Sequence, residues 1–177
     1  MKSCAAILLF CALAALFPFR APAQTNSPDA WKAGSVSYQM EEYGWHIGNV
    51  SCDLHIAVSA GMLVATTQTK SDWSSKTQPA KPHDIHSLSE TSSVALADID
   101  ADALTTSKDK RGHPAFWQVR VSSKKPKGVR LASIRDGQNL GDTDADSLVL
   151  NYPDEGSAKK AVREIRALAL HAQAPHK

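Results

Sequence analysis

Residues 50–69 read VSCDLHIAVSAGMLVATTQT, and this stretch decides the fold. From Val50 to Val58 the even positions are apolar, and mostly polar side chains stand between them. This period of two is typical of a strand that has one face against a core and the other in solvent. Ser59-Ala60-Gly61 supplies a turn, and the run 62–69 returns as the second strand of a hairpin.

The same alternation predicts further strands on both sides of this hairpin. We expect strands near residues 36–40, 50–58, 62–69, 94–99, 116–122, 129–134 and 148–152. The apolar phase slips near Ala97-Asp98, which predicts a β-bulge. The stretches 70–93 and 136–146 are rich in polar, Gly or Pro residues and lack an apolar period, so we interpret both as loops.

The last part of the chain changes to a helical period. Asp154 is the expected N-cap, because its carboxylate can accept an N–H bond at the positive end of the helix dipole. Apolar side chains then recur every three or four residues, with Ile165 and Leu168 as the main anchors. The expected fold is therefore mainly β: about seven antiparallel strands in a small barrel or curved sheet, capped by helix 155–172.

This order of elements, with the ending SLVLNYPDEGSAKKAVREIRALALHA at residues 147–172, resembles the pleckstrin-homology-like barrel of exported bacterial proteins. The resemblance covers roughly residues 36–172 and implies a barrel whose open end is capped by the helix. The basic first hairpin that binds phosphoinositides in that family has no counterpart, since residues 50–69 contain no Lys or Arg. The Trp usual in the helix of eukaryotic members is also absent, so no binding residue is carried over. A lipocalin-like barrel or a helix-grip fold would show much of the same pattern.

The first 23 residues predict a secretory signal peptide that is cleaved. Lys2 precedes an uncharged apolar run, and Ala21-Pro22-Ala23 gives the small residues that signal peptidase recognises. The run is shorter than the about 20 residues of a membrane-spanning helix. We therefore expect a secreted or periplasmic protein without a transmembrane anchor after cleavage. Its expected parts are a flexible lead-in at 24–35, one domain at 36–173 and a tail at 174–177.

The charges of the chain are segregated along the sequence. The formal charge of +2 comes from 20 Lys and Arg against 18 Asp and Glu, and the predicted signal peptide carries the excess. Bases dominate residues 108–135, whereas acids dominate residues 136–155. The expected binding residues lie on a basic hairpin at 120–130: Arg120, Lys124, Lys125, Lys127 and Arg130. Such a patch could contact an acidic protein, a glycan or an anionic lipid surface, while the neutral total does not favour nucleic acid.

Two short motifs could bind metal. His83 and His86 form an H-x-x-H pair, a candidate zinc site if the fold supplies further ligands. Asp142, Asp144 and Asp146 imitate the first half of a calcium loop whose second half is missing. No complete metal, cofactor or catalytic signature is present, so we expect neither a cofactor nor a catalytic residue.

Cys52 is the only cysteine after residue 23. It lies between Val50 and Leu54 on the apolar face, where burial raises the pKa of a thiol and makes it inert. We therefore expect a structural thiol.

The leading functional hypothesis is an exported, non-enzymatic binding or interaction module that uses the basic hairpin or the polar loop 70–93. Two alternatives stay open. One is a small-ligand carrier with an interior cavity, lined by Val50, Leu54, Trp117 and Val119. The other, less favoured, is a small hydrolase or metal-binding protein that uses His83 or His86 with an Asp.

Overall fold

The computed structural model describes residues 31–42, 46–78 and 80–175. The predicted signal peptide at 1–23, and the lead-in up to residue 30, lie outside these residues.

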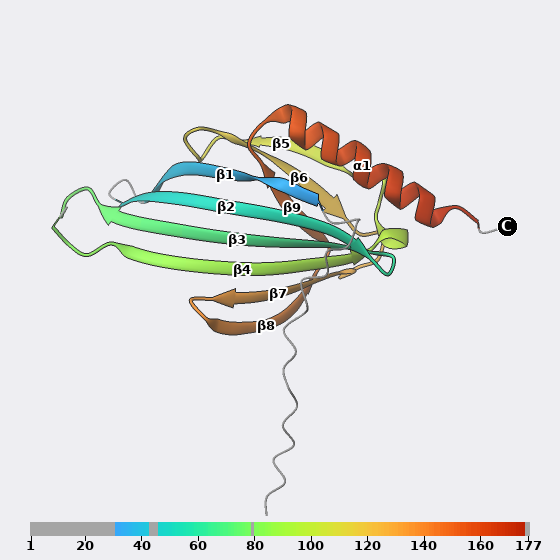
Figure 1. Ribbon diagram of the computed structural model, residues 1–177, viewed down its shortest axis with the longest axis horizontal. Coiled ribbons are helices and arrows are strands. Elements are labelled where there is room, and N and C mark those ends of the chain that lie inside the picture. Colours follow the sequence, from blue (N-terminus) through green and yellow to red (C-terminus); the bar gives the residue numbers. More distant parts are fainter. Residues whose placement is uncertain (1–30, 43–45, 79, 176–177) are drawn as a thin grey trace, which may run out of the picture.

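The described chain forms two antiparallel sheets and one α-helix (Figure 1). The six-stranded sheet has the order β1-β2-β3-β4-β7-β8, and the three-stranded sheet has the order β5-β6-β9. The strands are β1 (Trp31–Glu42), β2 (His46–Ser59), β3 (Met62–Ser75), β4 (Asp84–Ala95), β5 (Thr105–Asp109), β6 (Phe116–Ser122), β7 (Val129–Arg135), β8 (Gln138–Ala145) and β9 (Ser147–Tyr152), followed by helix α1 (Glu155–Gln173). The expected mainly-β fold with a C-terminal helix is confirmed, but the sheets do not close into a barrel.

The hairpin predicted from residues 50–69 forms as β2 and β3. Ser59 pairs with Met62 across a two-residue turn in which Ala60 and Gly61 both have positive φ, 48° and 75°. Such a turn matches the right-handed twist of the two strands. Leu54, on the expected apolar face, is 1% exposed, so this face meets the core as the alternation predicts.

Two segments predicted as loops are strands. β3 continues to Ser75 and β4 begins at Asp84, so the loop expected at 70–93 shrinks to a short connection. Trp73 still pairs with Asp84 at this end of the β3–β4 ladder, which extends beyond the other sheet and the helix (Figure 1). Because no second layer covers this end of the ladder, neither of its faces needs apolar side chains. The strands are held there by backbone pairing, and their sequence shows no apolar period. The loop expected at 136–146 is likewise the β7–β8 hairpin.

Three smaller predictions were also wrong. β1 begins at Trp31, inside the expected lead-in 24–35. The phase slip near Ala97-Asp98 is a 3₁₀ turn, Leu96–Asp98, at which the chain leaves the six-stranded sheet, rather than a bulge. β5 is not among the expected strands, because its residues are mostly polar and exposed and show no apolar period.

The basic segment 120–130 is not a hairpin. β6 pairs with β5 and β9, whereas β7 pairs with β4 and β8, so residues 123–128 cross from one sheet to the other. Lys127 takes a positive φ of 54° in this crossing, and its backbone N–H donates to Asp146 Oδ1 at 2.7 Å. Two consecutive strands with a short connection suggested a paired hairpin, but the two strands belong to different sheets, and both contribute apolar side chains to the one core.

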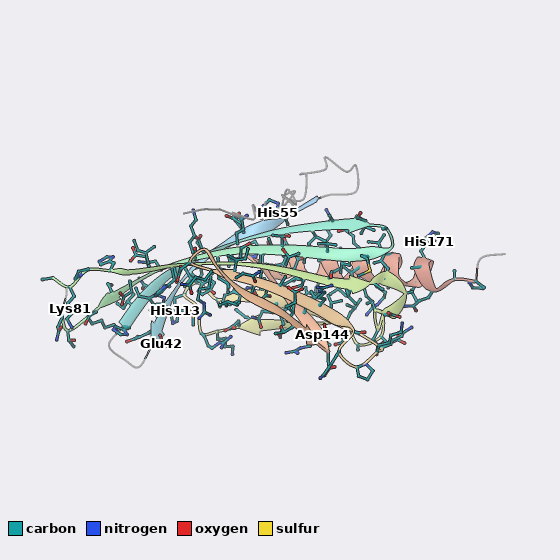
Figure 2. All side chains as sticks on the ribbon, turned by 90° about the horizontal axis from the view of Figure 1, so that it is seen from below. Glu42, His55, Lys81, His113, Asp144 and His171 are labelled. Carbon is teal, nitrogen blue, oxygen red and sulfur yellow. The ribbon has the colours of Figure 1, made fainter. Side chains whose placement is uncertain are left out.

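Helix α1 begins as predicted, since Asp154 Oδ1 accepts the N–H of Ser157 at 2.8 Å. It packs against β5, β6, β9 and the 3₁₀ turn. Its buried residues are Ala158, Ala161, Ile165 and Ala169, while Leu168 is only partly buried. Figure 2 shows His171 near the end of this helix and Lys81 at the tip of the β3–β4 hairpin, at opposite ends of the molecule.

Candidate functional site: the cleft between the two sheets

A cleft of about 420 Å³ lies between the two sheets, beside the apolar core. Along one face of β3, Leu63 and Ala65 belong to the core, whereas Thr67 and Thr69 line the cleft. The complete lining is Thr67, Thr69, Leu88 and Glu90 from the six-stranded sheet, Gln118, Arg120, Val149 and Asn151 from the three-stranded sheet, and Arg111. The space between the sheets is therefore apolar and filled in one part, and polar and open in the other.

β6 and β9 present two different faces. Val119 pairs with Leu150, and both are buried in the core. The neighbouring pair, Gln118 and Asn151, points the other way and lines the cleft. Because side chains alternate along a strand, the pairing of β6 with β9 places two amides side by side on the cleft wall.

These amides connect to the thiol of Cys52. Gln118 Nε2 donates to Asn151 Oδ1 at 3.3 Å, and Asn151 Nδ2 lies 3.9 Å from Cys52 Sγ. Cys52 is 2% exposed, and burial raises its pKa. The thiol therefore lies buried beneath the cleft, as its place on the apolar face of β2 predicts, and burial favours its neutral form.

Arg111 is held at the rim of the cleft by Asp109. The Asp109 carboxylate is almost completely buried, and Arg111 Nε donates to both of its oxygens at 3.1 Å. These hydrogen bonds hold the pKa of Asp109 below its usual range. A buried carboxylate stays charged when it is paired in this way, so the guanidinium is fixed in direction.

The backbone after Arg111 is held against β1. Gly112 lies over Tyr38, where a Cβ atom would come within 2.8 Å of Tyr38 Cδ2. The ring of Tyr38 stacks on Phe116 at a centroid distance of 4.4 Å. His113 then exchanges two backbone hydrogen bonds of 2.8 Å with Gln39. Only glycine allows this close approach, which anchors the segment that carries Arg111.

Arg120 and Glu90 face the cleft without neutralising each other. Arg120 Nη1 donates to Ser147 Oγ at 3.0 Å, and Glu90 Oε2 lies 3.5 Å from the hydroxyl of Ser133. Neither side chain belongs to an ion pair within the described part of the chain. The cleft thus offers a guanidinium and a carboxylate that retain hydrogen-bonding capacity for a ligand.

The five predicted basic residues do not gather on one surface. Arg120 lines the cleft, whereas Arg130 alternates with the core-facing Leu131 and so lies on the opposite face of its sheet, where it binds Asp142. Lys124 Nζ donates to Gln173 Oε1 at 2.8 Å, on the helix side of the molecule. The other contacts are Lys125 with Asp98 at 2.9 Å, and the backbone of Lys127 with Asp146.

Neither candidate metal motif brings its residues together around one point. His83 Nδ1 contacts Asp72 at 2.7 Å, whereas His86 Nδ1 contacts Asp136 at 3.0 Å. Asp72 pairs with Ile85, the neighbour of His86, so the two histidine contacts lie on opposite faces of the sheet.

Asp142 and Asp144 lie on strand β8, and Asp146 follows it; Asp142 binds Arg130, and Asp146 accepts the N–H of Lys127. Among residues 31–42, 46–78 and 80–175, no three His, Cys, Asp or Glu side chains are grouped as metal ligands.

Sequence reasoning identified Arg120 but missed Arg111, Glu90 and the two amides. The available signal was the polar face of the strands at 116–122 and 148–152, which contains Gln118 and Asn151. That signal becomes a site only once the pairing of these two strands, which are distant in sequence, is known.

Comparison with known proteins gave no match to a family model, to a curated protein or to a solved structure. The resemblance to the pleckstrin-homology-like barrel therefore stays a prediction. No helix in the described ranges combines the length and the apolar character needed to cross a membrane.

Proposed function

We propose that this protein is an exported, non-enzymatic binding module, and that the cleft between its sheets holds a small polar ligand with a carboxylate group. The observation that carries the proposal is the pair Arg120 and Glu90, which line one cleft without an ion pair to each other. The basic-hairpin hypothesis is thereby replaced by a site that retains one of its residues, Arg120.

The lining favours a hydroxylated acid. A guanidinium can bind a carboxylate through two charge-assisted hydrogen bonds. The amides of Gln118 and Asn151 and the hydroxyls of Thr67 and Thr69 can each donate and accept, which suits ligand hydroxyl groups. The volume of the cleft falls within the range of small-ligand sites, and its lining is more polar than is usual for them, which favours a polar ligand.

Of the alternative hypotheses, the small-ligand carrier is the one most similar to this proposal. It differs in the site, because it placed the ligand in an interior cavity. Leu54 and Val119 were the expected lining of an interior cavity, yet both are fully buried members of the core. No space remains between these two side chains. Of the other two expected lining residues, Trp117 packs against the core, and Val50 borders a separate hollow of about 590 Å³ with Tyr38 and Ile85.

The test is isothermal titration of the purified protein with galacturonate, gluconate and tartrate. We expect Arg120→Ala to weaken binding by about tenfold, the effect of losing one charge-assisted contact. Arg130→Ala is the matched control and leaves the affinity unchanged, since Arg130 lies on the other face of its sheet. Absence of binding to all three acids, or equal loss in both variants, would contradict the proposal.

A hydrolase makes a different prediction. Ser71 lies across from His86 in the β3–β4 ladder, and His86 contacts Asp136. No hydrogen bond joins Ser71 to His86 in the described structure, so the contact of nucleophile with base is missing. Hydrolysis of p-nitrophenyl acetate that disappears in His86→Ala would overturn the non-enzymatic proposal.

A further inference from the structure

The cleft continues into a second hollow along the same face of β3 and β4. This hollow, about 280 Å³, is lined by Thr69, Ser71, His86, Ser87, Leu88, Arg135 and Asp136. Thr69 and Leu88 line both spaces, so the cleft and the hollow are adjacent. We call the two together the inner-face groove.

The groove carries guanidinium groups in both of its parts. Arg111 and Arg120 line the cleft, and Arg135, which pairs with Leu88 in the ladder, lines the second hollow. Arg135 is exposed and takes part in none of the ion pairs of the described chain. Its charge is therefore available to a ligand that reaches beyond the cleft.

The acidic residue that lines the second hollow, Asp136, is already engaged. Asp136 Oδ1 accepts the backbone N–H of Ser87 at 2.6 Å, and Asp136 Oδ2 contacts His86. The Ser87 N–H is the main reason why the pKa of Asp136 lies below its usual range. The groove therefore has two carboxylates: Asp136, held by Ser87 and His86, and Glu90 in the cleft, which has only a 3.5 Å contact with Ser133.

We infer that the inner-face groove binds a short oligosaccharide of uronic acids, an inference that rests on the proposed function of the cleft. Thr67, Thr69, Ser71 and the two amides line the groove with groups suited to sugar hydroxyls. Arginines in separate parts of the groove suit carboxylates that recur along a sugar chain.

Other extended ligands fit this lining less well. A densely sulfated chain would bring its charges against the carboxylate of Glu90. An extended peptide gains much of its affinity by pairing with a free sheet edge, but β3 and β4 are central strands with partners on both sides. A uronic acid chain has fewer charges and depends on side-chain contacts, which is what the groove provides.

The experiment is isothermal titration of the purified protein with galacturonate and with its linear tetramer. Maltotetraose, a heparin tetrasaccharide and pentaglutamate are the comparison ligands. We expect the tetramer to bind about tenfold more tightly than the monomer, because it gains a second carboxylate contact. Arg135→Ala removes this gain and leaves monomer affinity unchanged, whereas Arg130→Ala, on the same strand, alters neither. Thermal melting of both variants verifies that they remain folded.

The outcomes separate the two proposals. Monomer binding that is lost in Arg120→Ala, with no gain for the tetramer or no effect of Arg135→Ala, overturns the extended groove and leaves the proposed function standing. Absence of monomer binding contradicts the proposed function itself. Tighter binding of heparin or pentaglutamate than of the galacturonate tetramer overturns the choice of a uronic acid chain, and equal binding of maltotetraose overturns the role of the carboxylates.

Discussion

Ile165→Ala tests whether α1 is held by one anchor. Ile165 is the only large side chain among the four buried residues of the helix, and it is 0% exposed; the others are alanines. The substitution removes about three methylene equivalents at about 0.8 kcal/mol each, or about 2.4 kcal/mol. The paired strands beneath the helix cannot collapse into the space, and the resulting cavity raises the expected loss to about 3–4 kcal/mol.

Urea unfolding followed by circular dichroism measures this loss of stability. The same loss lowers Tm by about 10 °C for a domain of this size. Leu170→Ala is the control on the same helix, because Leu170 is 54% exposed and its removal is expected to cost less than about 0.5 kcal/mol. If both variants lost less than about 1 kcal/mol, docking of the helix through Ile165 would be refuted.

Two further variants test the N-cap of the helix and the lysines of the connection at residues 123–128. Asp154→Ala lowers Tm at neutral pH, because the N–H of Ser157 loses its acceptor; this hydrogen bond also holds the pKa of Asp154 below its usual range. Because the pKa of Asp154 is lower in the folded state, its carboxylate stabilises the fold above the unfolded pKa of about 3.9, and this stabilisation is lost as the pH falls through the folded pKa. The Tm difference between the protein and the variant should therefore shrink in acid. A Tm difference that stays constant with pH would speak against the cap. Replacing Lys124, Lys125 and Lys127 by Gln is expected to reduce heparin retention no more than the same change at Lys70, Lys76 and Lys81. Arg120 and Arg130 lie on different faces, and Lys124 and Lys125 are engaged with Gln173 and Asp98. Earlier elution of the first variant alone would restore the basic-patch hypothesis.

The parts of the fold that could be predicted are those in which burial imposes a period. Along β2, apolar residues such as Leu54 and Ile56 alternate with more polar ones because one face of the strand meets the core. Along α1, buried residues such as Ala161, Ile165 and Ala169 recur at helical spacing for the same reason. Polar strands gave no such signal. Thr143 in β8 has exposed neighbours on both sides, so only backbone pairing shows that it belongs to a strand.

The site was harder to predict than the fold. Arg120 could be identified from its strand, since it opposes the apolar face that contains Val119. Arg111 and Glu90 reach the same cleft from a connection and from a strand that sequence alone assigned to a loop. Their convergence depends on the pairing of β6 with β9 and on the position of one sheet against the other, and local periodicity contains neither.

The two-faced strand β9 has a consequence for how this protein can be altered. Leu148, Leu150 and Tyr152 are committed to the core, while Val149 and Asn151 between them face the cleft. If the cleft binds the proposed ligand, a library randomised at Val149 and Asn151 alters its lining without touching the core, whereas randomising the other three removes stability first. Cleft lining and core packing thus occupy interleaved positions of one six-residue strand, so each set can be altered separately.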